Sequence, residues 1–270
     1  MEEYEYKTGA WIQWCPGCGN YGILSALRKA VSELEIEPRR LVIVGGIGCA
    51  SRIVYYIRGS NVHAIHGRAI PVATGIKLAN PHLTVIVCGG DGDLLGIGAG
   101  HFVALGRRNA DVKVFIHDNA VYGLTKGQAG ATLMREVKLK AMTRPNVQDG
   151  VNPVLLAFSS GYGFIARAYA YHMREMKEMM KEAILHRGSA IIDILQPCVT
   201  YNDLMTRDWF EQRIYYVENP LSEKDLIEKM SEKDKIALGI LYRSQKDTLE
   251  DAIARNRKVD KDFLRNFEVK

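Results

Sequence analysis

Short apolar runs alternate with amphipathic stretches along most of the chain. The runs at residues 41–44, 84–88, 112–116 and 190–195 have the length and composition of buried strands. Apolar residues at helical spacing lie between them and predict helices near residues 23–34, 66–80, 97–105 and 172–186. Strands that alternate with helices indicate an α/β fold, in which a mainly parallel sheet is covered by helices on both faces.

The two ends of the chain differ from this regular middle part. Residues 1–19 predict an irregular arm, and residues 205–270 are richer in charge, with a helical pattern at 249–254. A chain of 270 residues is long enough to bury one large core. We therefore expect a main domain at residues 1–204 and a small C-terminal extension at residues 205–270.

Composition and charge exclude several classes of protein. Hydrophobic residues make up 47% and charged residues 25% of the chain, as in ordinary globular proteins. No run approaches the ~18 apolar residues of a membrane-spanning helix. The acidic start of the chain is unlike a signal peptide, so we expect a cytoplasmic protein with no membrane partner. The net charge of +5 is spread out, without basic blocks interleaved with aromatic residues, and predicts no nucleic-acid partner.

Reactive side chains are concentrated where two of the predicted strands end. Gly90-Asp91-Gly92-Asp93 follows the strand at 84–88, and Asn119 follows the strand at 112–116. Ligands of open α/β sheets bind at the carboxyl ends of the strands. Asp91 and Asn119 offer oxygen donors that suit Mg²⁺, and glycine N–H groups at a helix start can face a phosphate. The pattern predicts a diphosphate held through Mg²⁺, and it resembles the binding motif of thiamine diphosphate (ThDP).

Two other phosphate-binding motifs do not fit this stretch. The dinucleotide fingerprint G-x-G-x-x-G fails because Leu95 stands at its last position when counted from Gly90. The Gly-Lys-Ser/Thr of a Walker loop does not occur in the sequence. An ordinary Gly/Asp turn after a strand is the alternative without a ligand. The spacing to Asn119 favours the cofactor over that turn.

Four of the five cysteines can form one metal-binding set. Cys15 and Cys18 form a C-x-x-C pair, while Cys49 and Cys198 each stand in a turn after a predicted strand. Cys88 lies inside an apolar strand and is interpreted as a small buried hydrophobic residue. Because disulfides are rare in the cytoplasm, the other four thiols predict a structural Zn²⁺ or an iron–sulfur cluster. Free or redox-active thiols remain an alternative, and the single C-x-x-C pair favours a cluster slightly over a zinc ribbon.

Five motifs occur together in one order along the chain. They are Trp14-Cys15-Pro16-Gly17-Cys18-Gly19-Asn20, Gly46-Ile47-Gly48-Cys49, His66-Gly67-Arg68-Ala69, Gly90-Asp91-Gly92-Asp93 and Tyr122-Gly123-Leu124-Thr125-Lys126-Gly127-Gln128. Together they closely resemble the β subunit of 2-oxoacid:ferredoxin oxidoreductases. The similarity covers about residues 10–200, and residues 205–270 resemble the short C-terminal extension of that family.

The resemblance implies one ThDP, one Mg²⁺ and one [4Fe-4S] cluster per β subunit. It implies that the cluster ligands are the four cysteines that remain without Cys88, namely Cys15, Cys18, Cys49 and Cys198. The implied Mg²⁺ ligands are Asp91, Asn119 and the backbone carbonyl of Val121. Residues of four motifs would line the cofactor: Ile47, Gly48, Cys49, Ala50, His66, Gly67, Arg68, Ala69, Gly92, Asp93, Gly123 and Leu124.

The same resemblance implies an activity and its partners. Enzymes of this family oxidatively decarboxylate a 2-oxoacid with coenzyme A to acyl-CoA and CO₂, and pass electrons through the cluster to ferredoxin. His66 and Arg68 are candidates for stabilising charge near the diphosphate or the substrate. No Glu of this chain suits the cofactor's aminopyrimidine ring, a role that the family gives to the α subunit. We therefore expect a heterodimer partner, without which this chain is inactive.

Residues 124–128 bear on the substrate preference through the same resemblance. This stretch resembles members that act on 2-oxoglutarate or on a broad range of 2-oxoacids, and it makes Lys126 a candidate partner for a substrate carboxylate. The neighbouring residues 129–132 depart from the Ser-Pro-Thr usual in this region, so the substrate range stays open.

Two rival hypotheses use the same residues differently. A non-redox ThDP-dependent 2-oxoacid decarboxylase would share Asp91 and Asn119 but would have no use for four converging cysteines. A zinc-stabilised α/β binding protein would use the cysteines and leave the Gly/Asp turn without a ligand. Analysis of bound iron, sulfide and zinc separates the three hypotheses.

Overall fold

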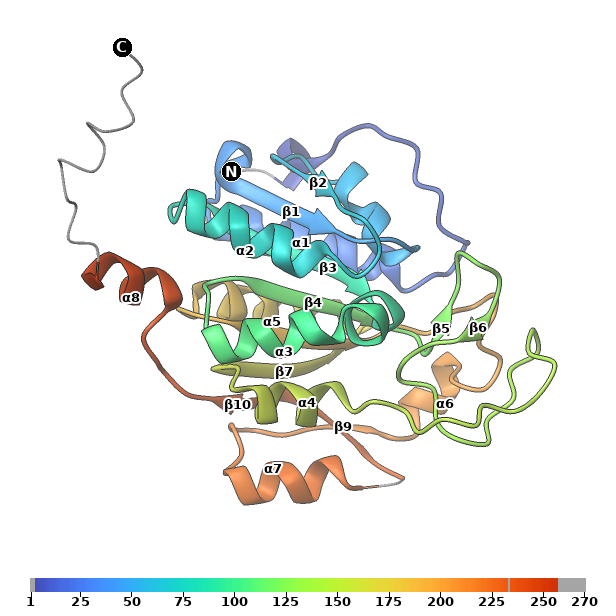
Figure 1. The fold of residues 1–270 in the computed structure, drawn as a ribbon. Coiled ribbons are helices and arrows are strands. Elements are labelled where there is room, and N and C mark those ends of the chain that lie inside the picture. Colours follow the sequence, from blue (N-terminus) through green and yellow to red (C-terminus); the bar gives the residue numbers. More distant parts are fainter. Residues whose placement is uncertain (1–2, 233, 257–270) are drawn as a thin grey trace, which may run out of the picture.

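A twisted β-sheet with helices on both faces forms the centre of the molecule (Figure 1). The computed structural model describes residues 3–232 and 234–256 of the chain. Within them, the main sheet has the strand order β2-β1-β3-β4-β8-β7-β10-β9. Its strands are β1 (Leu41–Gly45), β2 (Val62–His63), β3 (Thr84–Gly90), β4 (Lys113–Asp118), β7 (Phe164–Tyr169), β8 (Ala190–Leu195), β9 (Ile214–Tyr216) and β10 (Ile236–Arg243).

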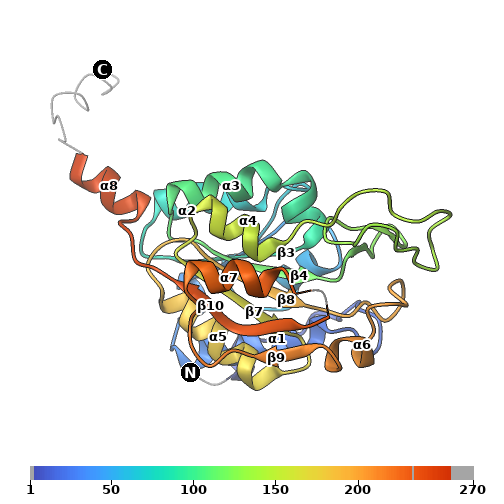
Figure 2. The ribbon, with the colours of Figure 1, turned by 90° about the horizontal axis from the view of Figure 1, so that it is seen from below.

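The helices form a layer on each side of this sheet. Helices α1 (Asn20–Glu33) and α5 (Met173–Leu185) lie on one face, and α2 (Ala69–Ala79), α3 (Ala99–Arg108) and α4 (Pro153–Ser160) lie on the other (Figure 2). Helix α7 (Glu223–Met230) packs beside β10. Shorter helices complete the described chain: η1 (Glu3–Tyr6), η2 (Pro38–Arg40), η3 (Ala50–Tyr55), η4 (Gly92–Ile97), α6 (Arg207–Glu211) and α8 (Leu249–Asn256).

Alternate side chains of the strands build one hydrophobic core on each face. On β1, Ile43 belongs to the core under α1 and α5, whereas its neighbours Val42 and Val44 belong to the core under α2 and α3. All five residues of β1 are buried, as expected for a parallel strand that is covered on both faces. The α/β fold with a mainly parallel sheet, predicted from the alternation of strands and helices, is confirmed.

The predicted strands and helices are present, and several elements were missed. The runs at 41–44, 84–88, 112–116 and 190–195 form β1, β3, β4 and β8, and the helices expected near 23–34 and 172–186 form α1 and α5. The apolar run at 154–158 lies in α4, where the Asn152 side chain accepts from the first free N–H groups and Pro153 stands at the first turn. The pattern did not identify β7, β9 or β10.

Residues 205–256 add strands to the same sheet. Strand β10 pairs antiparallel with β7, and β9 pairs parallel with β10. The division of the chain after residue 204 stays a prediction, and residues 257–270 of the expected extension lie outside the described part.

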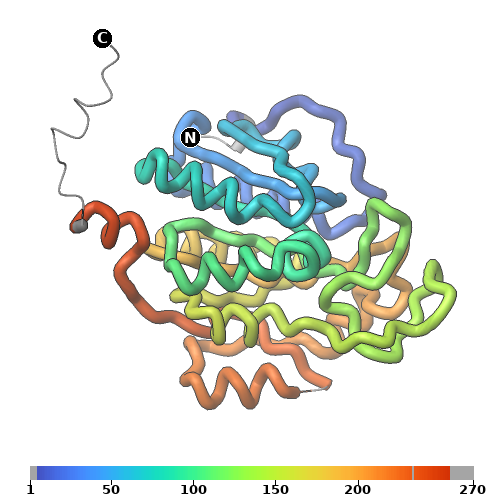
Figure 3. Tube along the Cα trace, in the orientation of Figure 1, coloured from blue at the N-terminus to red at the C-terminus, as the bar shows by residue number. Residues whose placement is uncertain are grey.

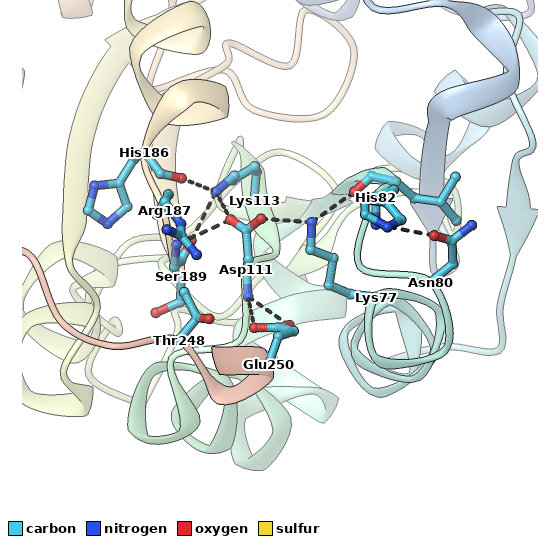
Figure 4. A network of polar contacts seen from close by, with 12 residues as sticks. Lys77, Asn80, His82, Asp111, Lys113, His186, Arg187, Ser189, Thr248 and Glu250 are labelled. Atoms are coloured by element: carbon cyan, nitrogen blue, oxygen red, sulfur yellow. Dashed lines mark hydrogen bonds and ion pairs between the residues drawn. The ribbon is translucent and has the colours of Figure 1, made fainter. Parts of the chain in front are cut away.

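A buried polar network lies at the amino-terminal ends of the sheet strands and connects them to neighbouring elements (Figure 4). The Asp111 carboxylate, just before β4, forms ion pairs with Lys77 and Lys113. The Glu250 carboxylate, on α8, accepts a hydrogen bond of 3.1 Å from the backbone N–H of Asp111. This network therefore attaches α8 to the edge of the sheet opposite the predicted cofactor residues.

The helices also bear on the question of a membrane. Within 3–232 and 234–256, none is both long and apolar enough to cross a bilayer.

Candidate cofactor and metal sites

Four adjacent parallel strands bring the predicted site residues to one edge of the sheet. Strands β1, β3, β4 and β8 are neighbours, and the register pairs Gly90 with His117 and Asp118 with Leu195. The segments that follow these strands therefore start side by side. In Figure 3 the N-terminal arm, the loop after β4 and the segment after β8 come together on the right-hand side of the view.

The first of two cavities at this edge, here called the Asp91 cavity, has a volume of about 140 Å³. It contains twelve of the residues predicted to bind cofactor or metal, and they come from the segments after β1, β2, β3 and β4. They are Ile47, Gly48, Cys49, Ala50, His66, Asp91, Gly92, Asp93, Asn119, Val121, Gly123 and Leu124.

Asp91 is held in this cavity by a turn that follows strand β6 (Gln128–Ala129). Its side chain is almost fully buried, and Oδ2 accepts hydrogen bonds from the backbone N–H and the hydroxyl of Thr132. A Cβ at Gly130 would come within 2.3 Å of Oδ2, so the turn passes too close for a side chain there. Burial raises the pKa of Asp91 to about 6, although the hydrogen bonds from Thr132 oppose this.

Asn119 is fixed by hydrogen bonds on both sides of its amide. Its Oδ1 accepts from the N–H of Val121 at 3.0 Å, and its Nδ2 donates to Gln196 Oε1 at 3.1 Å. The residue between Asn119 and Val121, Ala120, has a positive φ of 60°, which turns the chain into strand β5 (Val121–Tyr122). Together with Asp91 these residues present carboxylate, amide and carbonyl oxygens, the donor set that Mg²⁺ prefers.

Glycines leave room for a cofactor against the backbone of this cavity. Gly48 has a φ of +131°, and a Cβ built there would meet no atom within 4 Å. Gly90 is similarly open, with its nearest neighbour 3.9 Å away. At Gly92, in contrast, a Cβ would come within 2.4 Å of the Tyr122 ring. The oxygen donors and the open glycine backbone fit a cofactor with a metal-bound diphosphate.

The Asp93 side chain clamps two loops of the Asp91 cavity together. Its Oδ1 accepts hydrogen bonds from the backbone N–H of Ile47 (3.1 Å) and of Gly67 (2.7 Å), and it lies 2.6 Å from His66 Nδ1. A Cβ at Gly46 would come within 2.0 Å of Asp93 Oδ2. Oδ1 of this carboxylate is thus occupied by the loops around it, whereas Oδ2 is buried without a hydrogen-bond partner among the described residues.

Four of the residues predicted to contact the cofactor or the substrate do not line the Asp91 cavity. Gly67 is buried behind Asp93, and the Ala69 side chain belongs to the hydrophobic core at the start of α2. The Arg68 side chain is exposed, and its Nη1 donates to the carbonyl of Gly67. Lys126 is exposed on the loop beyond Leu124, with a positive φ of 79°. The roles expected of these residues stay predictions.

The second cavity, here called the cysteine cavity, brings together the four predicted thiols. Cys15, Cys18, Cys49 and Cys198 all line it, and its volume is about 160 Å³. The fifth thiol, Cys88, has no exposed surface and lies in the core, which confirms its interpretation as a buried hydrophobic residue.

The irregular arm is held over this cavity by a tight turn and an indole hydrogen bond. Gly17 has a positive φ of 79°, and the N–H of Cys18 donates to the carbonyl of Cys15. The Trp14 indole N–H donates to the carbonyl of Cys49 at 2.7 Å. The Cys15–Cys18 pair is thereby fixed to the loop that carries the third thiol.

The thiols of the cysteine cavity lie close enough to influence one another's ionisation. Burial, with smaller contributions from the other three thiols, raises the pKa of Cys18 to about 12, although a hydrogen bond from the backbone N–H of Asn20 opposes this. No group of three or more His, Cys, Asp or Glu side chains within 3–232 and 234–256 has the arrangement of a single-ion site. Thiolates on one Zn²⁺ stand ~4 Å apart, as Zn–S bonds of ≈ 2.3 Å require. A [4Fe-4S] cluster is larger, and four thiols spaced around one cavity fit it.

The two cavities share a wall. Cys49, Asn119, Gly123 and Leu124 line both of them. A Cβ at Gly123 would lie 3.6 Å from the Cys49 sulfur and 3.9 Å from the Cys198 sulfur. The glycine therefore keeps the space between the sulfurs and the Asp91 cavity free of a side chain.

Several residues of the two cavities were not predicted as site residues. Thr132 and Gln196 hold the side chains of Asp91 and Asn119. Gln196 Nε2 also lies 3.4 Å from the Cys18 sulfur, and Asn20 lines the cysteine cavity. Their partners are distant in the sequence, so no local spacing could identify them. Gln196 and Asn20 each lie two positions from a predicted cysteine in the sequence, and this was the available signal.

Comparisons with known proteins agree with this arrangement. Residues 46–194 match the family described as "Thiamine pyrophosphate enzyme, C-terminal TPP binding domain". Residues 198–258 match a second family, the C-terminal part of the beta subunit of pyruvate ferredoxin oxidoreductase. The first match includes the Asp91 cavity, and the second begins at Cys198.

Individual relatives cover most of the chain. Subunit beta of 2-oxoacid:ferredoxin oxidoreductase 2 from Aeropyrum pernix is 59% identical over 89% of this chain and 83% of its own length. The 2-oxoacid:ferredoxin oxidoreductase subunit beta from a Sulfolobus species is 52% identical over 88% of this chain and 84% of its own. A solved structure, 2-oxoglutarate:ferredoxin oxidoreductase from Magnetococcus marinus with 2-oxoglutarate, coenzyme A and succinyl-CoA bound, has a TM-score of 0.93 and 32% identity. That comparison covers 100% of this chain and 97% of the other.

Proposed function

The chain belongs to the family of β subunits of 2-oxoacid:ferredoxin oxidoreductases, and on that premise we propose that it binds ThDP and Mg²⁺ beside a [4Fe-4S] cluster. With an α subunit and coenzyme A, it would oxidatively decarboxylate a 2-oxoacid to acyl-CoA and CO₂ and pass the electrons to ferredoxin. The observation that carries this proposal is the shared wall between the Asp91 cavity and the cysteine cavity. An oxidoreductase needs its electron donor and acceptor adjacent, whereas a decarboxylase without redox chemistry does not.

The residues of the Asp91 cavity would hold the cofactor. When bound, ThDP supplies the carbon nucleophile and electron sink for decarboxylation, and a cluster accepts electrons singly. Asp91, Asn119 and the carbonyl of Val121 would bind Mg²⁺, and the N–H groups of residues 92 and 93 would face the diphosphate. His66 is held at the cavity by Asp93, where it can stabilise negative charge on the cofactor or the substrate.

An α subunit is expected to complete the Asp91 cavity. Its volume of about 140 Å³ is less than the ~300–1,000 Å³ of pockets that enclose a ligand of drug size. Ile47 and Leu124 on its lining are 41% and 43% exposed, and the nearby Ile65 is 75% exposed. Exposed apolar side chains at a cavity rim support a protein partner at this surface. This incomplete enclosure supports the expectation that the chain is inactive without its α subunit.

We further propose that the substrate is 2-oxoglutarate or one of a broad range of 2-oxoacids. The stretch 124–128 and the names of the relatives support this. Lys126 is exposed close to the cavity wall and would pair with a substrate carboxylate. Replacement by Met should then reduce kcat/KM for 2-oxoglutarate more than for pyruvate. An equal loss for both substrates would assign Lys126 another role.

Metal analysis of the enzyme tests the proposed cofactors. The chain is co-expressed with its α subunit and purified without oxygen, and iron, acid-labile sulfide, zinc and ThDP are measured. About four irons and four sulfides per β chain are expected, with ferredoxin reduction that requires a 2-oxoacid and coenzyme A. Zinc without iron would contradict the proposed oxidoreductase, because Zn²⁺ cannot accept electrons. ThDP without either metal would favour the non-redox decarboxylase.

Two cysteine variants provide a matched pair for this test. Cys49→Ala removes a sulfur from the shared wall and is expected to lose the cluster and ferredoxin reduction. Cys88→Ala removes the buried thiol in the core and should retain the cluster. A full cluster in Cys49→Ala would contradict the proposed ligand set.

A further inference from the structure

A buried pair of polar side chains lies behind the cysteine cavity. Asn20 is the first residue of α1, two positions after Cys18, and only 1% of its surface is exposed. It lines the cysteine cavity together with the four thiols. His117, in β4, is fully buried, and its Nδ1 lies 2.7 Å from Asn20 Oδ1.

The chemistry of the two groups fixes which atom donates. The Oδ1 atom of an asparagine amide can only accept, so His117 must donate from Nδ1. The Nδ1 atom of His117 therefore carries a proton that points at the Asn20 carbonyl oxygen. The histidine therefore holds the Asn20 amide with its oxygen toward β4 and its nitrogen turned away.

The nitrogen of that amide has no partner among the described residues. Asn20 Nδ2 is buried, and no protein acceptor in 3–232 and 234–256 receives a hydrogen bond from it. Buried donors without acceptors are rare because their desolvation is not compensated. A donor left in this state on the wall of a cavity indicates an acceptor that occupies the cavity.

A second amide on the same wall already lies within hydrogen-bond distance of a sulfur. Gln196 Nε2 lies 3.4 Å from the Cys18 sulfur and also donates to the carbonyl of Pro197 at 2.9 Å. Gln196 Oε1 accepts from Asn119, so this amide too is held in one orientation. The wall of the cysteine cavity thus carries two oriented amide N–H donors, one of which already meets a thiol.

We propose that Asn20 Nδ2 donates a hydrogen bond to a sulfur of the bound cluster, and that His117 is the positioning residue that orients this donor. The inference rests on the proposed function, because it requires a cluster in the cysteine cavity. A reduced cluster carries one more negative charge than an oxidised cluster, so an N–H donor stabilises the reduced form more. Asn20 therefore raises the reduction potential of the cluster and makes it a better acceptor of electrons from the cofactor site.

The test is the reduction potential of the cluster in the complete enzyme, purified with its α subunit without oxygen. Asn20→Leu keeps the shape of the side chain and removes the donor. The expected shift is negative and corresponds to roughly a tenfold change in the one-electron equilibrium constant, or ~59 mV. His117→Phe keeps a ring but cannot orient the amide, and should shift the potential in the same direction by a smaller amount.

Tyr21→Phe is the matched control. Tyr21 lies in the same turn of α1 as Asn20, but its hydroxyl donates to the Trp14 carbonyl and does not face the cavity. Its removal should leave the reduction potential of the cluster unchanged. Iron and sulfide are measured for every variant. If Asn20→Leu does not retain iron, the His117→Phe potential decides the question.

The outcomes separate the two levels of the proposal. Wild-type enzyme without iron would overturn the proposed function itself. Wild-type and variants with full iron content and equal potentials would overturn the inference and leave the proposed function intact. A negative shift in Asn20→Leu or His117→Phe, with none in Tyr21→Phe, supports it, because a role in folding alone would not move a potential.

Discussion

Replacement of Asp111 by Asn is expected to destabilise the protein strongly, although the residue lies far from both cavities. Its carboxylate is the acidic partner of Lys77 and Lys113, whose side chains are only 7% and 3% exposed (Figure 4). The Lys113 ammonium also donates to the backbone carbonyls of His186 and Gly188. It therefore cannot turn outward to water without breaking those bonds.

The size of the effect follows from this burial. Asp111→Asn keeps the shape of the side chain but leaves two ammonium groups at the sheet edge without a carboxylate. Removal of one partner of a buried ion pair costs about 3–5 kcal/mol in free energy of unfolding. At roughly 2–4 °C per kcal/mol, the melting temperature should fall by about 6–20 °C.

The pKa shifts of the pair set the expected pH dependence. Burial alone would raise the pKa of Asp111, but Lys113 and Lys77 outweigh it, so the pKa lies below its ordinary value. A carboxyl with a lowered pKa in the folded state stabilises the protein above its ordinary pKa, and this stability is lost as the pH falls through the folded value. For Lys113 the balance is reversed, because burial lowers its pKa and Asp111 offsets this only in part. The pair is thus costly to break rather than strongly favourable in itself.

Thermal unfolding of wild type and variant over a range of pH tests this reasoning. The difference in melting temperature should be full above about pH 5 and should shrink below about pH 4. Asp149→Asn is the control, because its partner Arg135 is exposed and the loss of that pair should be hardly measurable. A change in Asp111→Asn as small as in this control, or one that persists at low pH, would refute the argument.

Three further predictions concern the cavities. Thr132→Val removes the hydroxyl that holds the carboxylate of the proposed Mg²⁺ site. The Mg²⁺ dissociation constant, measured by calorimetry in the presence of ThDP, should therefore rise about 10–100-fold. Thr132→Ser keeps the hydroxyl and should bind Mg²⁺ normally. Gly92→Ala forces a methyl group against a tyrosine ring and should cost about 1–3 kcal/mol of stability, measured by thermal unfolding. Gly100→Ala, in α3 with no atom within 4 Å of its Cβ, should not destabilise the protein. Trp14→Phe removes the hydrogen bond to the Cys49 carbonyl, which is worth about 1 kcal/mol. The cluster absorbance should then decay faster in air than in the wild type. An unchanged decay would show that this hydrogen bond does not protect the cluster.

Strand β8 was recognised although Asp193 lies in its middle, because isoleucines flank that residue. Strand β7 was missed because Arg167 interrupts its apolar run. The structure explains why this charge is tolerated: Asp193 on the neighbouring strand β8 is its register partner, and the two side chains form a buried ion pair at 2.8 Å. Local periodicity cannot show that a charge in a strand is neutralised by a residue 26 positions away in the sequence.

The same limit applies to the C-terminal part. Strand β10 reads as an apolar run, but it stands in a charge-rich region whose helices and loops dominate the pattern. Its place in the main sheet depends on pairing with β7, which lies about 70 residues earlier in the chain and was itself not recognised. The extension was therefore expected as an appendage, whereas β10 and β9 continue the sheet.

The candidate sites were easier to anticipate than their supports. Asp91, Asn119 and the cysteines have types and spacings with a direct chemical meaning. Thr132 and His117 have ordinary identities, and they acquire a role only through the side chains that the fold places against them. Sequence patterns can identify groups that bind a ligand, but the groups that orient them are found from three-dimensional contacts.

One loop connects the two cavities, because a single motif of the sequence contributes residues to both. Residues 46–50 contribute Ile47 and Gly48 to the Asp91 cavity and Cys49 to both cavities. Asp93 fixes one end of this loop through the N–H of Ile47, and Trp14 fixes the other through the Cys49 carbonyl. The separation between cofactor and cluster would then be set by backbone atoms held at both ends rather than by mobile side chains. Electron transfer between them would accordingly depend more on the integrity of this loop than on any one residue that contacts the substrate.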